Sequence, residues 1–280
     1  MDIQLATERL FLIEDRLSAE DALGLANERR LQAFGGGLGS LLQRPKADDV
    51  VLVARQRRLE PFWHVVATAH YHYERRRDYN VPASAPEVEA VTIEGVRYET
   101  SSTGAAPRAF SMAAIEHCHD EFRNDVYTDG ISGEPLADPA ALLAAAHAEV
   151  TDPAALGGGD AIVVPPEQRA SFVVRTALAA VMKPVQADKI LEETISLDAT
   201  DLYYRAFWAF EFTWQGKGKQ GVVEVDAITG KARPGRPLMS QIKGMITRDL
   251  LFDVGADTVG LLVPGGSIAV RLAQAAIDRK

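Results

Sequence analysis

An alternating aromatic stretch around residue 210 constrains the fold of this chain most strongly. Within residues 205–214, Trp208, Phe210, Phe212 and Trp214 occupy every second position. Successive side chains of a β-strand point to opposite faces, so this pattern predicts a strand with one buried face. The chain therefore needs a sheet with a core packed against this side.

Residues 60–71 look like a second copy of that stretch, because Phe62-Trp63 aligns with Phe207-Trp208. A related phrase containing proline and aspartate precedes each copy, from residue 44 and from residue 183. Strand alternation gives the earlier copy its own bulky face. That face consists of Trp63, Val65, Ala67, Ala69 and Tyr71. We infer an internal duplication from the repeated pattern.

The fold class expected from this duplication is α+β. Two related units would each contain an antiparallel sheet and a packed helix, joined by a helical insert and followed by a C-terminal helix. The expected segments follow in chain order. They are an N-terminal strand and helix (1–37), a first repeat unit (38–101), a helical insert and linker (102–164), a second repeat unit (165–235) and a helical tail (236–280).

Several local patterns predict helices and turns. Ser18 suits the N-cap of a helix that runs to about residue 34, and apolar spacing predicts a second helix over residues 168–182. A glycine-rich connection at residues 216–221 predicts a hairpin loop. A terminal helix is expected over residues 268–278. Helical spacing in the insert is carried by Met112, Ile115, His119, Phe122 and Val126.

Composition limits the class of protein. Of the 280 residues, 47% are hydrophobic and 25% charged, which is typical of a globular chain. The net charge of −9 argues against a protein that coats nucleic acid or an anionic membrane. Cys118 is the single cysteine, and the first residues lack the pattern of an export signal, so a cytoplasmic location is expected. Residues 254–276 are too interrupted by polar residues for a membrane span.

The phrase Val-Asp-Ala-Ile-Thr-Gly-Lys at residues 225–231, after a predicted helix and strand pair, resembles the closing hairpin of PepSY-type modules. These are small cystatin-like α+β units, and the similar region covers residues 170–232. The resemblance implies a helix packed on an antiparallel sheet. It also implies a binding or inhibitory role in preference to catalysis.

His70 and His72 are the candidate metal ligands. On a strand they point the same way, about 6–7 Å apart, which allows two imidazoles to share one zinc ion. His64 lies about 20 Å along the strand from His70 and cannot join them, so a third ligand such as His117 or Glu74 is needed. The alternative is a polar sheet face with incidental histidines, which the corresponding residues of the second copy favour.

Residues 116–120 place Cys118 between two histidines, a pattern that resembles a metal or nucleophile cluster. On the helix predicted there, His117 and His119 face opposite sides and cannot bind one ion. Cys118 then belongs to the apolar face as a small buried residue. A cysteine–histidine nucleophile pair remains the alternative.

A local basic excess identifies a candidate contact surface. Residues 43–80 contain eight arginines and lysines against five acidic residues. The residues predicted to contact a partner are Arg75, Arg76, Arg77, Tyr73 and His64. Arginine and aromatic rings also suit nucleic acid, although a solvated surface is the simpler interpretation.

The sequence as a whole favours a non-enzymatic cytoplasmic binding or assembly protein. Its contact surface would be the His/Arg-rich face of the first repeat, with a protein partner or a second copy of the chain bound there. No cofactor is expected under this hypothesis. The alternatives are a metal-dependent hydrolase that uses zinc at His70 and His72, and a nucleic-acid-binding protein.

Overall fold

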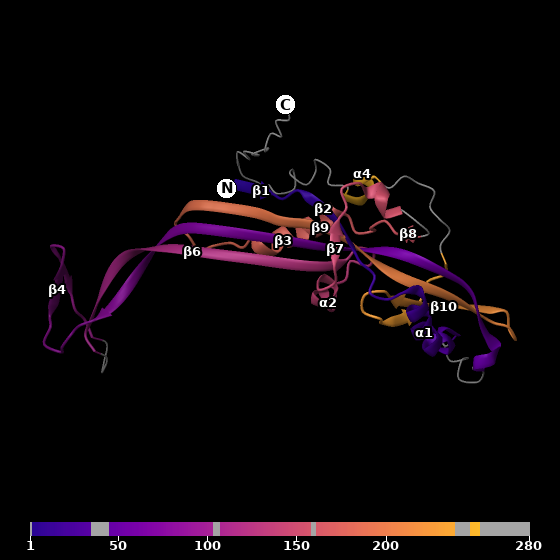
Figure 1. Ribbon diagram of the computed structural model, residues 1–280. Coiled ribbons are helices and arrows are strands. Elements are labelled where there is room, and N and C mark those ends of the chain that lie inside the picture. Colours follow the sequence, from indigo (N-terminus) through magenta and orange to yellow (C-terminus); the bar gives the residue numbers. More distant parts are fainter. Residues whose placement is uncertain (1, 35–44, 103–106, 158–160, 239–246, 253–280) are drawn as a thin grey trace, which may run out of the picture.

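The protein is an elongated arch built on three long antiparallel strands (Figure 1). A computed structural model describes residues 2–34, 45–102, 107–157, 161–238 and 247–252. The long strands are β3 (Val50–Pro82), β6 (Ala109–Asp129) and β9 (Lys189–Trp214). The central strand β3 has β9 along one edge, and β6 along the other edge from Phe62 onward.

Shorter strands extend this mixed sheet beyond β9. They are β1 (Asp2–Leu5), β2 (Glu8–Ile13), β7 (His147–Glu149), β10 (Lys219–Asp226) and β11 (Ala232–Pro234). Strands β1 and β2 run parallel to β9, whereas β10 runs antiparallel to it. On the opposite edge of β3 from β9, β8 (Ala161–Val163) pairs in parallel with residues 57–59 of β3, just outside the stretch that pairs with β6.

One face of the sheet carries most of the core. Helices α1 (Ala19–Arg29) and α3 (Ala170–Val181) pack against it, and the ring of Phe252 in α4 (Arg248–Phe252) contacts Trp63. Trp63 is fully buried, and its indole N–H donates to the carbonyl of Gln168. The smaller helices are α2 (Pro139–Leu143) and three 3-10 turns, η1 (Arg30–Phe34), η3 (Ala47–Asp49) and η4 (Pro153–Gly157).

At one end β3 and β6 continue past the rest of the sheet. Strand β9 stops pairing with β3 at Glu74, so residues 75–82 of β3 pair only with residues 109–116 of β6. We call this two-stranded ribbon the arm and the remaining structure the body. A small hairpin of β4 (Ala90–Ile93) and β5 (Val96–Glu99) forms the tip of the arm (Figure 1).

The α+β prediction is wrong. Strand takes up 52% of the structure and helix 19%, and the strands form a large mixed sheet. The two aromatic stretches do not belong to separate units, because they pair with each other in this sheet. Phe62 lies opposite Tyr203, and Arg58 lies opposite Phe207. Both stretches alternate because neighbouring strands bury the same face.

The prediction of a helix over residues 112–126 is also wrong, since this segment belongs to strand β6, which pairs with β3 without a break in register. Other local predictions are confirmed. Ser18 caps α1 by accepting from the amide of Asp21, and α3 and the β9–β10 hairpin form where expected. The helix expected at residues 268–278 lies outside the described residues. Within the described part of the chain, no helix is long and apolar enough to cross a membrane.

Candidate functional site

The face of the sheet opposite α1 and α3 is polar along β3 and β6. Odd-numbered residues of β6 lie on this face, opposite even-numbered residues of β3, without any shift of register. We call the stretch nearest the arm the histidine face. It comprises Thr68, His70 and His72 of β3 with His117, His119 and Glu121 of β6. Most of these side chains are exposed, so the face is accessible to a ligand.

His70 and His72 lie on one face, as their spacing predicted, and the structure adds a third imidazole. His119 lies directly opposite His72. The ring centroids of His119 and His70 are 6.2 Å apart, and those of His119 and His72 are 6.4 Å apart. The helix predicted over this segment hid His119, because a helix turns it away from the histidines of the neighbouring strand. The proposed third ligand Glu74 contacts His117 instead, at 3.5 Å.

His64 lies farther along the same face, in a self-contained cluster. Its ring stacks on Tyr127 at 4.3 Å, and its Nε2 is 3.0 Å from Asp125. Its Nδ1 lies 3.7 Å from Asp201, to which Arg9 donates two hydrogen bonds of 2.8 Å. Burial raises the pKa of Asp201, but the neighbouring His64 and Arg9 outweigh it and hold that pKa below its ordinary value. His64 is thus engaged within the chain.

The other predicted contact residues lie on two different faces of β3. Tyr73, Arg75 and Arg77 lie on the α3 side of β3, whereas Arg76 lies on the opposite side. Arg75 donates to Glu116, and the hydroxyl of Tyr73 donates to Asp120 at 2.9 Å. The three arginines therefore do not form one patch.

Glu116 is the acidic centre of the arm. It accepts hydrogen bonds from the hydroxyl of Tyr79 and from the guanidinium of Arg75. These two donors lower the pKa of Glu116. Both side chains of the Arg75–Glu116 pair are partly exposed, so water screens the ion pair and its contribution to stability is small.

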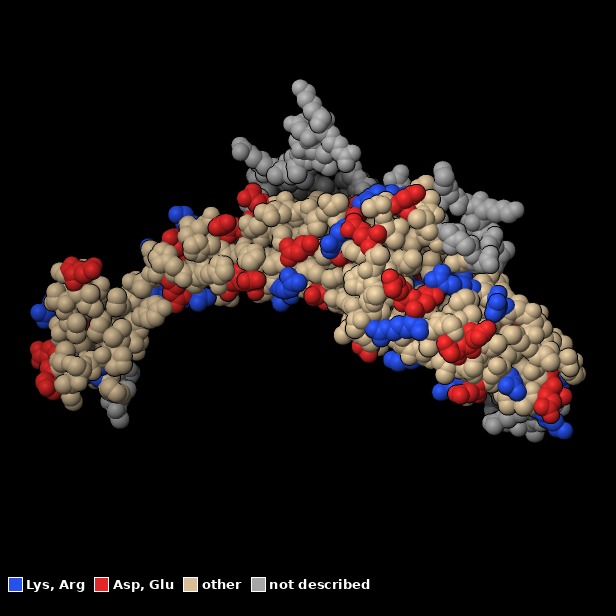
Figure 2. Space-filling model, in the orientation of Figure 1, with Lys and Arg blue, Asp and Glu red and all other residues tan. Residues whose placement is uncertain are grey.

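The basic excess of residues 43–80 is partly neutralised by acids from distant parts of the chain. Arg57 forms two hydrogen bonds of 2.9 Å with Asp15, and Arg58 is paired with Glu224 at 2.7 Å. Figure 2 shows charges of both signs interspersed along the visible face. That distribution lacks the broad basic surface on which nucleic-acid binding commonly depends.

A buried ionic network lies at the other end of β3, on the polar side of the sheet. Glu224 binds both Arg58 and Arg233, and Arg233 also binds Glu60 at 2.7 Å. Arg58, Glu60 and Glu224 are each at most 3% exposed. Arg58 additionally donates to the carbonyl of Pro237 at 2.9 Å. Because its members are paired with one another, this network ties β3 to β10 and β11.

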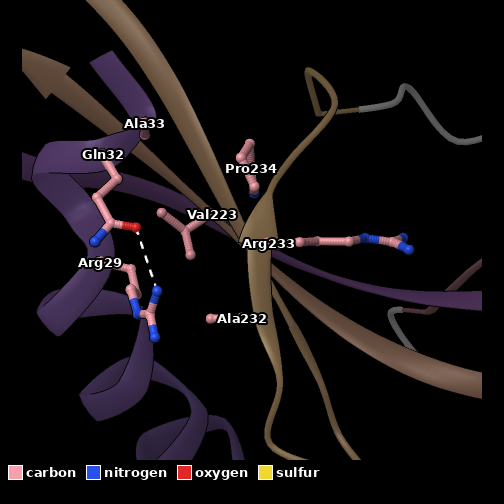
Figure 3. A pocket seen from close by; sticks show the side chains of 7 residues that line it. All are labelled: Arg29, Gln32, Ala33, Val223, Ala232, Arg233 and Pro234. Carbon is pink, nitrogen blue, oxygen red and sulfur yellow. Dashed lines mark hydrogen bonds between the residues drawn. The ribbon is translucent and has the colours of Figure 1, made fainter. Parts of the chain in front are cut away.

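The pocket beside this network is too small for a substrate. It lies between α1, η1 and strands β10 and β11, and its volume is about 20 Å³ (Figure 3). That is about the space needed for one water molecule. Arg233 turns its guanidinium away from the pocket, toward the ionic network (Figure 3). This pocket therefore offers no binding site for a small molecule.

Comparison with known proteins identifies no relative. No family model, no curated protein and no solved structure matches the chain.

Proposed function

We propose that this chain is a non-enzymatic binding and assembly protein of the cytoplasm, which associates with a second copy of itself through the arm. The observation that carries the proposal is the outer edge of β6. In the described part of the chain β6 has β3 as its one strand partner, over all 21 of its residues. An open strand edge is a template for another strand.

The hydrogen bonds at the two ends of β6 show which of its residues point their backbone groups away from β3. At one end the carbonyl of Tyr127 accepts from the amide of Leu136, and at the other Ala109 exchanges two hydrogen bonds of 2.8 Å with Ser101. Both strand residues are odd-numbered, and the register is unbroken between them. Because outward groups recur at every second residue of an antiparallel strand, the odd residues from 111 to 125 direct theirs away from β3.

The open edge differs in chemistry along its length. Residues 116–125 contain charged side chains, which protect an edge against pairing. Residues 109–115 contain none, and the side chain of Ile115 is 55% exposed. The arm therefore offers the less protected part of the edge. A two-stranded ribbon is also marginally stable alone, so added strands would stabilise it.

A second copy fits this edge in an antiparallel register. With a twofold axis at Ala114, Ala113 lies opposite Ile115 of the second copy, and Met112 lies opposite Glu116 of the second copy. No like charges then face each other. The same operation centred on Glu116 or Asp120 would place identical carboxylates in contact, which disfavours those registers.

The test is sedimentation analysis of the purified chain and two variants at Ala113. Ala113→Pro removes an outward N–H and keeps the ladder with β3, because proline is tolerated at a strand edge. We expect it to weaken the dimer about tenfold or more, since two symmetric hydrogen bonds of about 1 kcal/mol each are lost. Ala113→Val keeps the N–H and should remain dimeric. A monomeric wild type, or equal dissociation constants for both variants, would refute the proposal.

A further inference from the structure

The histidine face contains three imidazoles at the corners of a small triangle. His70 and His72 occupy alternate positions of β3, and His119 projects from β6 directly opposite His72. His119 lies 6.2 Å from His70 and 6.4 Å from His72, measured between ring centroids. Two backbones joined by a regular ladder hold the three side chains on one surface, so the sheet fixes the positions of their Cα atoms.

These distances are close to those that one metal ion requires. Zinc binds imidazole nitrogen at about 2.0–2.1 Å in a tetrahedral arrangement, which places two coordinated ring centres roughly 5 Å apart. The ring of His119 is about 1 Å farther than that from each of the rings of His70 and His72. In the described chain no three ligand side chains are already arranged around an ion. Side-chain rotation, which exposed histidines perform readily, has to complete the site.

The surroundings of the triangle favour a cation. The carboxylate of Glu121 lies 3.9 Å from Nδ1 of His70, so a small rotation of either side chain would form a hydrogen bond that leaves Nε2 for a metal. Glu192 of β9 lies opposite His72 on the other side of β3. Arg123, in the direction of the body, is held by Asp198 and Asp125.

We propose that His70, His72 and His119 bind one divalent transition-metal ion, zinc foremost, with the fourth position open to water. Imidazole ligands suit zinc, copper and nickel, whereas magnesium and calcium prefer oxygen. Two ligands at alternate positions of one strand and a third on its neighbour occupy one side of the ion, and the other side faces solvent. The site is independent of the arm edge at residues 111–115.

The test is a titration of the untagged, chelator-treated protein with zinc, followed by calorimetry, and with cobalt, followed by its visible absorption. We expect one equivalent to bind, with the intense absorption of tetrahedral cobalt. His72→Gln and His119→Gln should each weaken binding by roughly tenfold or more, the loss typical of disrupted metal sites, and Glu121→Gln by about tenfold.

His117→Gln is the matched control, because His117 lies on the same face of β6 and outside the triangle. It should leave the affinity and the cobalt spectrum unchanged. Thermal unfolding of each apo variant verifies that these surface changes preserve the fold. No stoichiometric binding, or equal losses in the His117 and His119 variants, would overturn the proposal. The Ala113→Pro chain should bind metal normally, which separates this result from the test of assembly.

Discussion

The two ends of β3 hold their arginines in different settings, and the difference separates a structural part of the molecule from an available one. In the body, Arg58 is 1% exposed and bound to Glu224. On the arm, Arg75 binds Glu116 on a two-stranded ribbon, and both side chains are partly exposed. A buried ion pair must be complete to be tolerated, whereas an exposed pair changes stability little. The charged groups of the body are therefore needed for folding. The charged groups of the arm are not, so the arm is the proposed region of contact with a second copy.

The largest expected effect on the free energy of unfolding comes from removing one carboxylate charge in the body, compared with removing one on the arm. Glu224→Gln leaves Arg58 and Arg233 without their shared carboxylate, so we expect a loss of about 3–5 kcal/mol in the free energy of unfolding. Glu116→Gln on the arm should lose much less, because water screens the ion pair that Glu116 forms with Arg75. Urea denaturation of both variants measures the contrast. Equal losses would show that the two ends do not differ in this way.

A smaller effect is expected from Asp201 and depends on pH. Asp201→Asn removes the charge that accepts from Arg9, and bonds to charged groups contribute about 1.5–3 kcal/mol. Because the pKa of Asp201 is lowered by folding, its stabilisation is complete above the unfolded value of about 3.9 and is lost as the pH falls through the folded value.

Denaturation of wild type and Asp201→Asn at neutral pH and below pH 4 measures this dependence. The difference in unfolding free energy should be large at neutral pH and shrink in acid. A difference that stays constant with pH would contradict the role given to the Asp201 carboxylate.

The smallest effect on folding is expected from removal of the arm itself. Arg75 and Glu116 are directly paired, so residues 76–115 can be replaced by Asn-Gly, which suits a two-residue hairpin turn. We expect the melting temperature to change by less than about 4 °C, equivalent to about 1 kcal/mol for a body of this size. The same variant should be monomeric. Unfolding of this shortened chain would place the arm within the cooperative core.

Local signals in the sequence predicted local structure well. The cap at Ser18, helix α3 and the buried face of Trp63 depend on residues close together in the chain, and all are confirmed. The long-range pairing of β3 with β9 left a trace that was misinterpreted. Two strands that bury the same face of one sheet acquire similar alternating patterns, and such a pattern cannot be told from a duplication without knowledge of the pairing.

The site was predicted in part. Strand alternation placed His70 and His72 correctly on one face. His119 was not predicted to join them, because the spacing of Met112, Ile115 and Phe122 fits a helix and led to a helix prediction for this segment. Asp120 and Asn124 put polar residues on both sides of the strand, so polar alternation did not distinguish a strand from a helix. The partners of Arg58 and Arg233 could not be predicted, since their acids are distant in sequence and meet them only through the sheet.

The most direct measurement of the central claim is disulfide formation by Ala114→Cys in a Cys118→Ser background. In the proposed register Ala114 lies on the twofold axis as a non-hydrogen-bonded pair, with Cα atoms about 4.5 Å apart, which is within reach of a disulfide. Mild oxidation should convert the variant to a covalent dimer. Ser111→Cys, in the same background, should remain a monomer. A monomeric Ala114 variant, or equal crosslinking at both positions, would contradict the account.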